Sequence, residues 1–334
     1  MPGVGVIVNP WAGKDVRRLH APTGHSPDSA KVGVVRRVAI AALDAGADRV
    51  VAARDRGGIA ERALRGLDRT ELVDGPDTGS ALDSRRGATQ LAELDCSPIV
   101  VLGGDGTCRD VALGAPGCAM VAISTGTNNV FPRFVDGSSA GTAAGLVSTG
   151  AVALAAVARP AKVLHVSIER PDGSVEHDLA LVDVALIDEA RTGARAVLRS
   201  SSVRVVVATI ASPASTGLSA IAGRLSPLGR NSPGAVVVRL GGSRRVRVPI
   251  VPGVVDELGV ESVEGLLDGE SVELRGPGVL AFDGERDRVL PAGAIATVVV
   301  RVDGPFVVDV ERTLHCAANQ RLFDVPNVEA DDGD

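Results

Sequence analysis

The sequence predicts an α/β fold followed by an antiparallel β fold within one chain of 334 residues. The first 150 or so residues alternate short apolar runs with segments of helical spacing, which is typical of strands buried on both faces of a parallel sheet. Beyond Arg159 the apolar runs are instead separated by Gly, Pro and Asp turns, which favours antiparallel strands. The chain is longer than one ordinary core, so two structural parts are expected.

The amino-terminal elements are expected in the order strand, helix, strand, helix, strand. Strands are predicted at residues 4–8, 49–53, 71–73, 98–102 and 119–123. Apolar spacing predicts helices between them, over residues 32–42, 58–67, 77–94 and 107–113, and Ser29 is a candidate cap for the first of these.

The remaining chain is expected to be mainly β structure. Strands are predicted at residues 163–168, 179–187, 203–209, 236–240, 244–250, 271–274, 278–282 and 294–301, with helical content near 313–322. The segment 212–233 is expected to be a loop, either a functional flap or an exposed linker. We therefore expect an α/β domain over 1–158, a β domain over 159–303, a segment 304–323 that returns to the first domain, and an acidic tail over 324–334.

Composition excludes several classes of partner. The net charge is −6, Tyr is absent, and the chain has only five Phe and one Trp, so nucleic-acid binding is not expected. The charge-free stretch 137–158 is rich in Gly, Ala, Ser and Thr, which favours a helix packed on a sheet over a membrane span. The four cysteines and five histidines show no zinc-ligand spacing, and no export signal is visible, so a cytoplasmic protein is expected.

A glycine-rich loop follows the predicted strand at 98–102. It consists of Gly103, Gly104, Asp105, Gly106 and Thr107 and leads directly into a helical segment. Backbone amides at a helix amino terminus attract anions, and glycines let the backbone approach a polyphosphate. Thr107 is expected to cap the helix and to donate its hydroxyl to a phosphate. A carboxylate beside phosphates implies a Mg²⁺ ligand or a proton acceptor, although Gly-Asp-Gly is also an ordinary turn.

A second polar loop follows the next predicted strand, 119–123. Its residues are Ser124, Thr125, Gly126, Thr127, Asn128 and Asn129. Because ligands bind at the carboxyl ends of parallel strands, both loops should line one crevice. The structural alternative is a helix cap followed by an Asn turn.

Two further segments are candidates for chemistry. Asp283 and Glu285 flank Gly284 after the predicted strand 278–282, either as a simple turn or as a general base and a metal ligand. Asn9 and Lys14 follow the first strand and are placed to contact phosphates, although this segment does not match a Walker A loop.

These motifs together resemble the ATP-NAD kinase-like family, in particular its acetoin catabolism protein X type, within the GGDGT superfamily of NAD kinases and diacylglycerol and sphingosine kinases. The resemblance rests on Val6-Ile-Val-Asn-Pro10, the 103–107 loop, Ile123-Ser-Thr-Gly-Thr-Asn-Asn-Val-Phe-Pro132 and Asp283-Gly284-Glu285-Arg286. It implies a Rossmann-like doubly wound parallel α/β domain, a carboxyl-terminal β-sandwich and an ATP site between them.

The resemblance also implies roles for individual residues. Gly103, Gly104, Gly106 and Thr107 would hold the triphosphate of ATP. Asp105 would be the base or, with Asp283, a Mg²⁺ ligand. Thr125 to Asn129 would contact the nucleotide or the acceptor, and Glu285 matches the proposed base of the lipid kinases. A homo-oligomer is expected by the same resemblance.

One departure concerns the second polar loop. The corresponding loop of lipid kinases has the pattern Gly-Thr-x-Asn-Asp. This chain has Asn128-Asn129 there and so lacks the final aspartate of that pattern. Three functions follow. The first is a kinase that phosphorylates the 2′-hydroxyl of NAD. The second is a kinase for another small hydroxyl or lipid acceptor. The third is a nucleotide-binding protein without catalysis.

Overall fold

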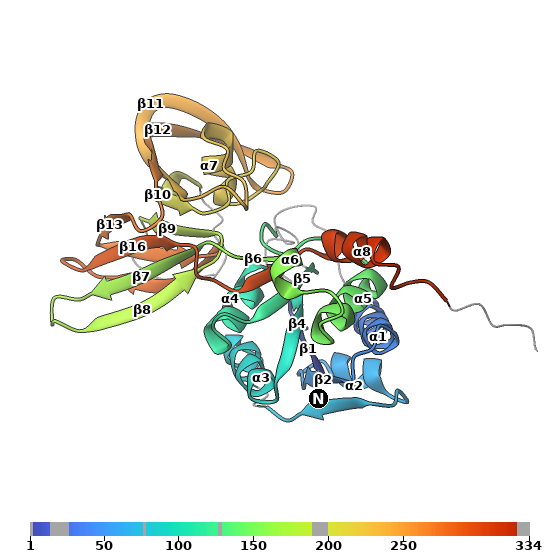
Figure 1. The fold of residues 1–334 in the computed structure, drawn as a ribbon. Helices are drawn as coiled ribbons and strands as arrows, with labels where there is room; N and C mark the ends of the chain where they lie inside the picture. The colour runs from blue at the N-terminus through green and yellow to red at the C-terminus, as the bar shows by residue number, and fades with distance from the viewer. Residues whose placement is uncertain (1–2, 14–26, 76–77, 126–128, 189–199, 326–334) are drawn as a thin grey trace, which may run out of the picture.

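The chain folds into a parallel α/β part and an antiparallel β part, which confirms the predicted fold class (Figure 1). The structure is a computed structural model that describes residues 3–13, 27–75, 78–125, 129–188 and 200–325. Lys14, Gly126, Thr127, Asn128 and most of the predicted acidic tail lie outside these ranges.

The α/β part is built on one seven-stranded sheet in the order β3-β2-β1-β4-β5-β17-β6. Its strands are β1 (Gly3–Val8), β2 (Arg49–Ala53), β3 (Thr70–Val73), β4 (Cys96–Gly103), β5 (Ala119–Ser124), β6 (Ala158–Pro160) and β17 (Phe306–Val308). All neighbouring pairs are parallel except β17 with β6. The predicted strands are confirmed, because buried apolar runs mark strands covered on both faces.

Helices cover both faces of this sheet. The helices on one face are α1 (Asp28–Asp44), α2 (Ile59–Leu64), α5 (Gly137–Ser148) and α8 (Val310–Asn319), and those on the other are α3 (Ala81–Glu93) and α4 (Asp105–Gly114). Helix α1 begins at Asp28 with Pro27 at the N-cap, so the prediction of Ser29 as its cap is wrong.

The charge-free stretch 137–158 forms α5 and the short α6 (Leu154–Val157). A Cβ on Gly141 would lie 2.3 Å from the Val38 carbonyl oxygen, so glycine allows α5 to contact the α1 backbone directly. Across the described ranges, no helix has the length and apolar character needed to cross a membrane.

The β part consists of two antiparallel sheets that enclose a second core. One sheet has the order β12-β11-β10-β9-β14-β15, and the other has the order β13-β16-β7-β8. The bounds are β7 (Val163–Glu169), β8 (Val175–Ala180), β9 (Asp183–Ile187), β10 (Val203–Ala208), β11 (Ala235–Val251), β12 (Val254–Leu266), β13 (Ser271–Arg275), β14 (Gly278–Phe282), β15 (Glu285–Leu290) and β16 (Ile295–Arg301).

Several predicted elements differ from the structure. The single strand predicted at 179–187 is the end of β8 and the whole of β9, which belong to different sheets. The chain passes from one sheet to the other at Leu181 and Val182, whose amides bond the Asp283 carboxylate instead of a neighbouring strand. The strands predicted at 236–240 and 244–250 form one long β11, in which the register shifts. The predicted loop 212–233 contains the helix α7 (Ser219–Leu225).

The carboxyl-terminal segment lies against the α/β part (Figure 1). Strand β17 is inserted between β5 and β6, and α8 then packs beside α5. This arrangement places the carboxyl end of β17 next to that of β5, at the edge of the sheet where ligands bind in parallel α/β folds.

Candidate functional site

The glycine loop, residues 103–107, joins β4 to α4. Gly104 is the N-cap of α4, with no side-chain cap, and Asp105 is the first helical residue. The prediction that Thr107 caps this helix is therefore wrong. Its hydroxyl instead accepts a hydrogen bond of 2.9 Å from the Asn9 side-chain amide. The loop thus presents a helix amino terminus without a side-chain cap, which is a favourable place for an anion.

Gly103 and Gly106 are glycines for different reasons. A Cβ on Gly103 would lie 2.5 Å from Cβ and Oγ1 of Thr107, so the folded protein itself has no room there. A Cβ on Gly106 would meet nothing within 4 Å. The folding of the described residues therefore does not require glycine at 106, whereas close approach of a ligand to the backbone would.

The second polar loop contacts the first directly. The Thr125 amide donates to the Gly103 carbonyl at 3.1 Å, and the Asn129 side chain donates to Ser124 Oγ at 2.7 Å. The hydroxyl oxygen of Thr125 is buried and has no hydrogen-bond partner among the described residues. The expectation that the loops share one crevice agrees with these contacts. Gly126, Thr127 and Asn128 lie outside the described residues.

Asp105 is buried, with 8% of its surface exposed, and its carboxylate accepts hydrogen bonds from backbone amides. The donors are Phe131 at 2.8 Å and Val130 at 3.0 Å. Burial raises the pKa of Asp105 to about 7, and the nearby Asp283 adds to this, while the two amides and Arg230 act in the opposite direction. A carboxyl group with a pKa near neutrality is suited to accept a proton from a hydroxyl.

Asp283 lies at the first central position of the tight turn between β14 and β15. Both central residues, Asp283 and Gly284, have positive φ angles of 51° and 81°, as in a type I′ hairpin turn. The carboxylate accepts hydrogen bonds from the amides of Leu181, Val182 and Asp183. Burial raises the pKa of Asp283, and the Arg109 guanidinium opposes this effect. The Asp283 carboxylate in this turn therefore binds the backbone where the chain passes from one β sheet to the other.

Asp105 and Asp283 line one small pocket of about 30 Å³. Asp183 and Ser219 line it as well, although neither was predicted as a site residue from the sequence. The sequence does distinguish Asp183, because it is a lone carboxylate within the apolar run 179–187. Ser219 had no distinguishing sequence pattern. The pocket joins carboxylates from the α/β part and the β part.

The carboxylates have a limited capacity for a metal ion. In the described ranges, no group of three or more His, Cys, Asp or Glu side chains is arranged to hold a metal. Mg²⁺ in phosphoryl-transfer sites usually binds one or two carboxylates together with substrate phosphates. Burial is the main cause of the raised pKa of Asp105, and the negative charge of Asp283 adds to it. A cation beside the two carboxylates would relieve their repulsion, so this pair fits Mg²⁺ in that mode.

Glu285 and Asn9 lie at the edges of this region. The Glu285 side chain is exposed, and the residue is not among those that line the small pocket. The Asn9 side chain connects the segment after β1 to the start of α4 through Thr107. The Lys31 ammonium is buried and donates to the carbonyl groups of Asn9, Pro10 and Ala12, which fixes the backbone after β1. The structure thus brings Asn9 and Thr107 together and places Glu285 on the surface.

A buried ion pair joins the α/β part to the β part close to this site. Arg109 of α4 lies 2.6 Å from the Asp178 carboxylate of β8, with side-chain exposures of 9% and 3%. The Arg109 guanidinium also donates to the Leu179 carbonyl and packs on the Phe282 ring. These contacts fix the position of α4 relative to β14 and therefore of Asp105 relative to Asp283.

Known proteins resemble this chain in sequence and in fold. The model of the acetoin catabolism protein X C-terminal domain matches residues 162–303, and that of the diacylglycerol kinase catalytic domain matches residues 55–163. Acetoin catabolism protein X of Cupriavidus necator is 31% identical over 337 residues, covering 96% of this chain and 94% of that protein. Yeast NADH kinase, solved with NADH, has the same fold, with a TM-score of 0.55, 15% identity and coverage of 99% and 91%.

Proposed function

The chain belongs to the acetoin catabolism protein X family, and we propose that it is an ATP-dependent kinase that phosphorylates the 2′-hydroxyl of NAD. The glycine loop is the main support for this proposal. It combines an N-terminus of α4 that has no side-chain cap with open space at the Cβ position of Gly106. Polyphosphates bind such loops through backbone amides.

The neighbouring residues support a role in holding ATP. Thr125 has a buried hydroxyl oxygen with no partner in the part of the chain that the structure describes, and a phosphate oxygen or a ribose hydroxyl would satisfy it. Asn9 and Thr107 lie side by side at the same end of the sheet. We assign these three residues, with Gly103, Gly104, Gly106 and Asn129, to the nucleotide site.

Asp105 is our candidate for the general base. Its raised pKa and its position within the glycine loop allow it to accept a proton from an acceptor hydroxyl. Asp105 and Asp283 would hold Mg²⁺, which when bound neutralises charge on the transferring phosphate. Glu285 remains a second candidate base, as the resemblance to lipid kinases implies.

The test is a direct assay of the full chain with ATP, Mg²⁺ and NAD. We expect NADP to form at high enzyme concentration, and the Asp105→Asn variant to lose at least a hundredfold in rate. ADP release without NADP would mean that the γ-phosphoryl group passes to water, and it would move the proposal to another small hydroxyl or lipid acceptor. The absence of both products would contradict a kinase that acts on NAD.

A nucleotide-binding protein without catalysis is the second candidate. It is favoured by the hydrogen bonds at Asp105 and Asp283, because both carboxylates already accept two or more backbone amides each. It predicts that calorimetry detects ATP or NAD binding while no phosphate is transferred. Any phosphotransfer abolished by Asp105→Asn would exclude it.

A further inference from the structure

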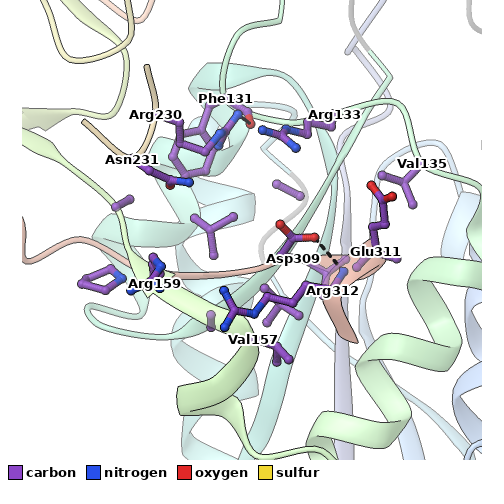
Figure 2. Close-up of a pocket in the computed structure, with 18 of the residues that line it drawn as sticks. Phe131, Arg133, Val135, Val157, Arg159, Arg230, Asn231, Asp309, Glu311 and Arg312 are labelled. Carbon is purple, nitrogen blue, oxygen red and sulfur yellow. Dashed lines mark hydrogen bonds between the residues drawn. The ribbon is translucent and has the colours of Figure 1, made fainter. Parts of the chain in front are cut away.

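A second and larger cavity lies on the other side of β5 from β4 and the glycine loop. Its volume is about 280 Å³, near the lower limit of small-molecule pockets. It lies at the carboxyl end of β17, between β6, the start of α8 and the segment after Asn129 (Figure 2). Nothing in the proposed kinase function uses this cavity.

The walls of the cavity carry an excess of positive charge. Five cationic side chains line it, namely Arg133, Arg159, Lys162, Arg230 and Arg312. The acidic side chains in the lining are Asp309 and Glu311, and the Asp309 carboxylate accepts the Arg312 backbone amide as the cap of α8. Figure 2 shows the four arginines around the cavity. Arg133, Arg159 and Arg312 are exposed, whereas Arg230 is half-buried and Lys162 is buried.

The two less exposed cations bond to carbonyl groups rather than to carboxylates. Lys162 is 4% exposed, and its ammonium group donates to the Gly229 carbonyl at 3.0 Å. The Arg230 guanidinium donates to the carbonyls of Val130 and Phe131. In the part of the chain that the structure describes, neither cation forms an ion pair with an acid.

This burial has an electrostatic cost. Burial lowers the pKa of Lys162 to about 8, with a further contribution from Arg230, and lowers the pKa of Arg230 to about 10, with a further contribution from Arg133. A bound anion would compensate these charges and supply acceptors for the remaining N–H groups of both side chains.

The cavity also has an apolar side. Val121, Phe131, Val157 and Ile210 contribute to its lining, and Phe134 at the rim is 85% exposed. A ligand for this cavity should therefore combine a charged group with a short apolar portion, which a simple inorganic ion lacks.

We propose that this cavity binds a small organic anion, with one phosphate or carboxylate group facing Lys162 and Arg230 and a short apolar portion against Phe131 and Val157. The site is separate from the glycine loop. ATP and the anion should therefore bind the protein at the same time.

The test uses phenyl phosphate and benzoate as probes, with phenol as the uncharged control. Each is titrated into the full chain by calorimetry at constant ionic strength. We expect at least one of the two anions to bind and phenol to bind at least tenfold more weakly. The better anion identifies the charged group that the site prefers.

Variants locate the binding. Lys162→Met should weaken anion binding about tenfold, because a charge-assisted hydrogen bond contributes about this much. Arg312→Gln should weaken it about threefold, because it removes one exposed positive charge from the lining of the cavity. Arg86→Gln is the matched control, since it removes one exposed positive charge on α3, which contributes nothing to the cavity, and should leave the affinity unchanged. Arg312 is exposed, so its replacement tests the site even if Lys162→Met does not fold.

The proposal also predicts the outcome of competition. Saturating ATP should leave the affinity for the anion within twofold of its value alone. Complete displacement by ATP would place the anion in the glycine loop and overturn the proposal. The proposal would also be overturned if neither anion bound at millimolar concentration, or if the wild type and the Arg312→Gln variant had equal affinities for the anion.

Discussion

Asp105 and Arg230 bind opposite sides of the same two residues of backbone. The Asp105 carboxylate accepts the amides of Val130 and Phe131, and the Arg230 guanidinium donates to the carbonyls of those residues. The hydrogen bond from the Phe131 amide to Asp105 is 2.8 Å long, and the one from Arg230 to the Phe131 carbonyl is 2.6 Å long. The segment that follows Asn129 is therefore held between a carboxylate of the α/β part and a cation of the β part.

Replacing Arg230 should change the titration of Asp105. The positive charge of Arg230 lowers the pKa of Asp105, which burial has raised to about 7. We therefore expect Arg230→Gln to raise the Asp105 pKa further and to move the pH midpoint of any Asp105-dependent activity upward. The pH dependence of kcat/KM measures the shift. An unchanged midpoint in a folded variant would show that Arg230 and Asp105 are not coupled.

Asp105 should also affect stability in a pH-dependent way. Its folded-state pKa of about 7 is above the ordinary value of 3.8, so the folded chain retains a proton that the unfolded chain releases. The stabilising contribution of the protonated group is complete below about pH 4 and is lost as the pH rises to about 7. The slope is at most about 1.4 kcal/mol per pH unit.

The Asp105→Asn variant is the reference for this measurement, because its amide is neutral at every pH. The free energy of unfolding of the wild type, minus that of the variant, should fall between pH 4 and 7 and then stay constant. The raised pKa of Asp283 has the same sign, but it is present in both proteins and largely cancels. A difference that is flat from pH 4 to 8 would contradict the expected titration.

The two glycines of the glycine loop should respond differently to alanine. Gly103→Ala should destabilise the protein by about 1–3 kcal/mol, since the new Cβ would clash with Thr107. Gly106→Ala should raise stability by up to about 1 kcal/mol, because alanine favours a helix and meets no atom there. If phosphates bind against this backbone, Gly106→Ala should nevertheless weaken ATP binding. Thermal unfolding and calorimetry with ATP separate the two effects, and an undiminished ATP affinity in Gly106→Ala would remove the glycine loop from the nucleotide site.

The buried pair Arg109 and Asp178 should contribute strongly to stability. Arg109→Met leaves the Asp178 carboxylate buried, with Arg288 as its one remaining ionic partner among the described residues, and should cost about 3 kcal/mol. The matched control is Arg54→Met, which breaks an exposed 2.8 Å pair with Asp74 and should have little effect. Urea unfolding followed by circular dichroism measures both, and equal losses would contradict the role of burial.

Much of this protein was predictable from local sequence patterns. Apolar periodicity located β1, β2, β4 and β5, and the spacing of glycines identified the loop before α4. These features are local, because burial on one or both faces of an element leaves a repeating pattern in neighbouring residues. The motif residues likewise placed the chain in its family, as the 31% identity to acetoin catabolism protein X shows.

The tertiary structure decided how distant residues meet. The run 179–187 is uniformly apolar apart from Asp183, so its pattern contains no sign of the change of sheet at Leu181 and Val182. That change occurs where the Asp283 turn bonds the two amides, about 100 residues away in sequence. The cationic cavity likewise forms only because β17 returns beside β5 and brings Arg312 near Lys162. Local periodicity determined the elements, whereas the position of each carboxylate and cation depended on long-range backbone pairing that no local pattern encodes.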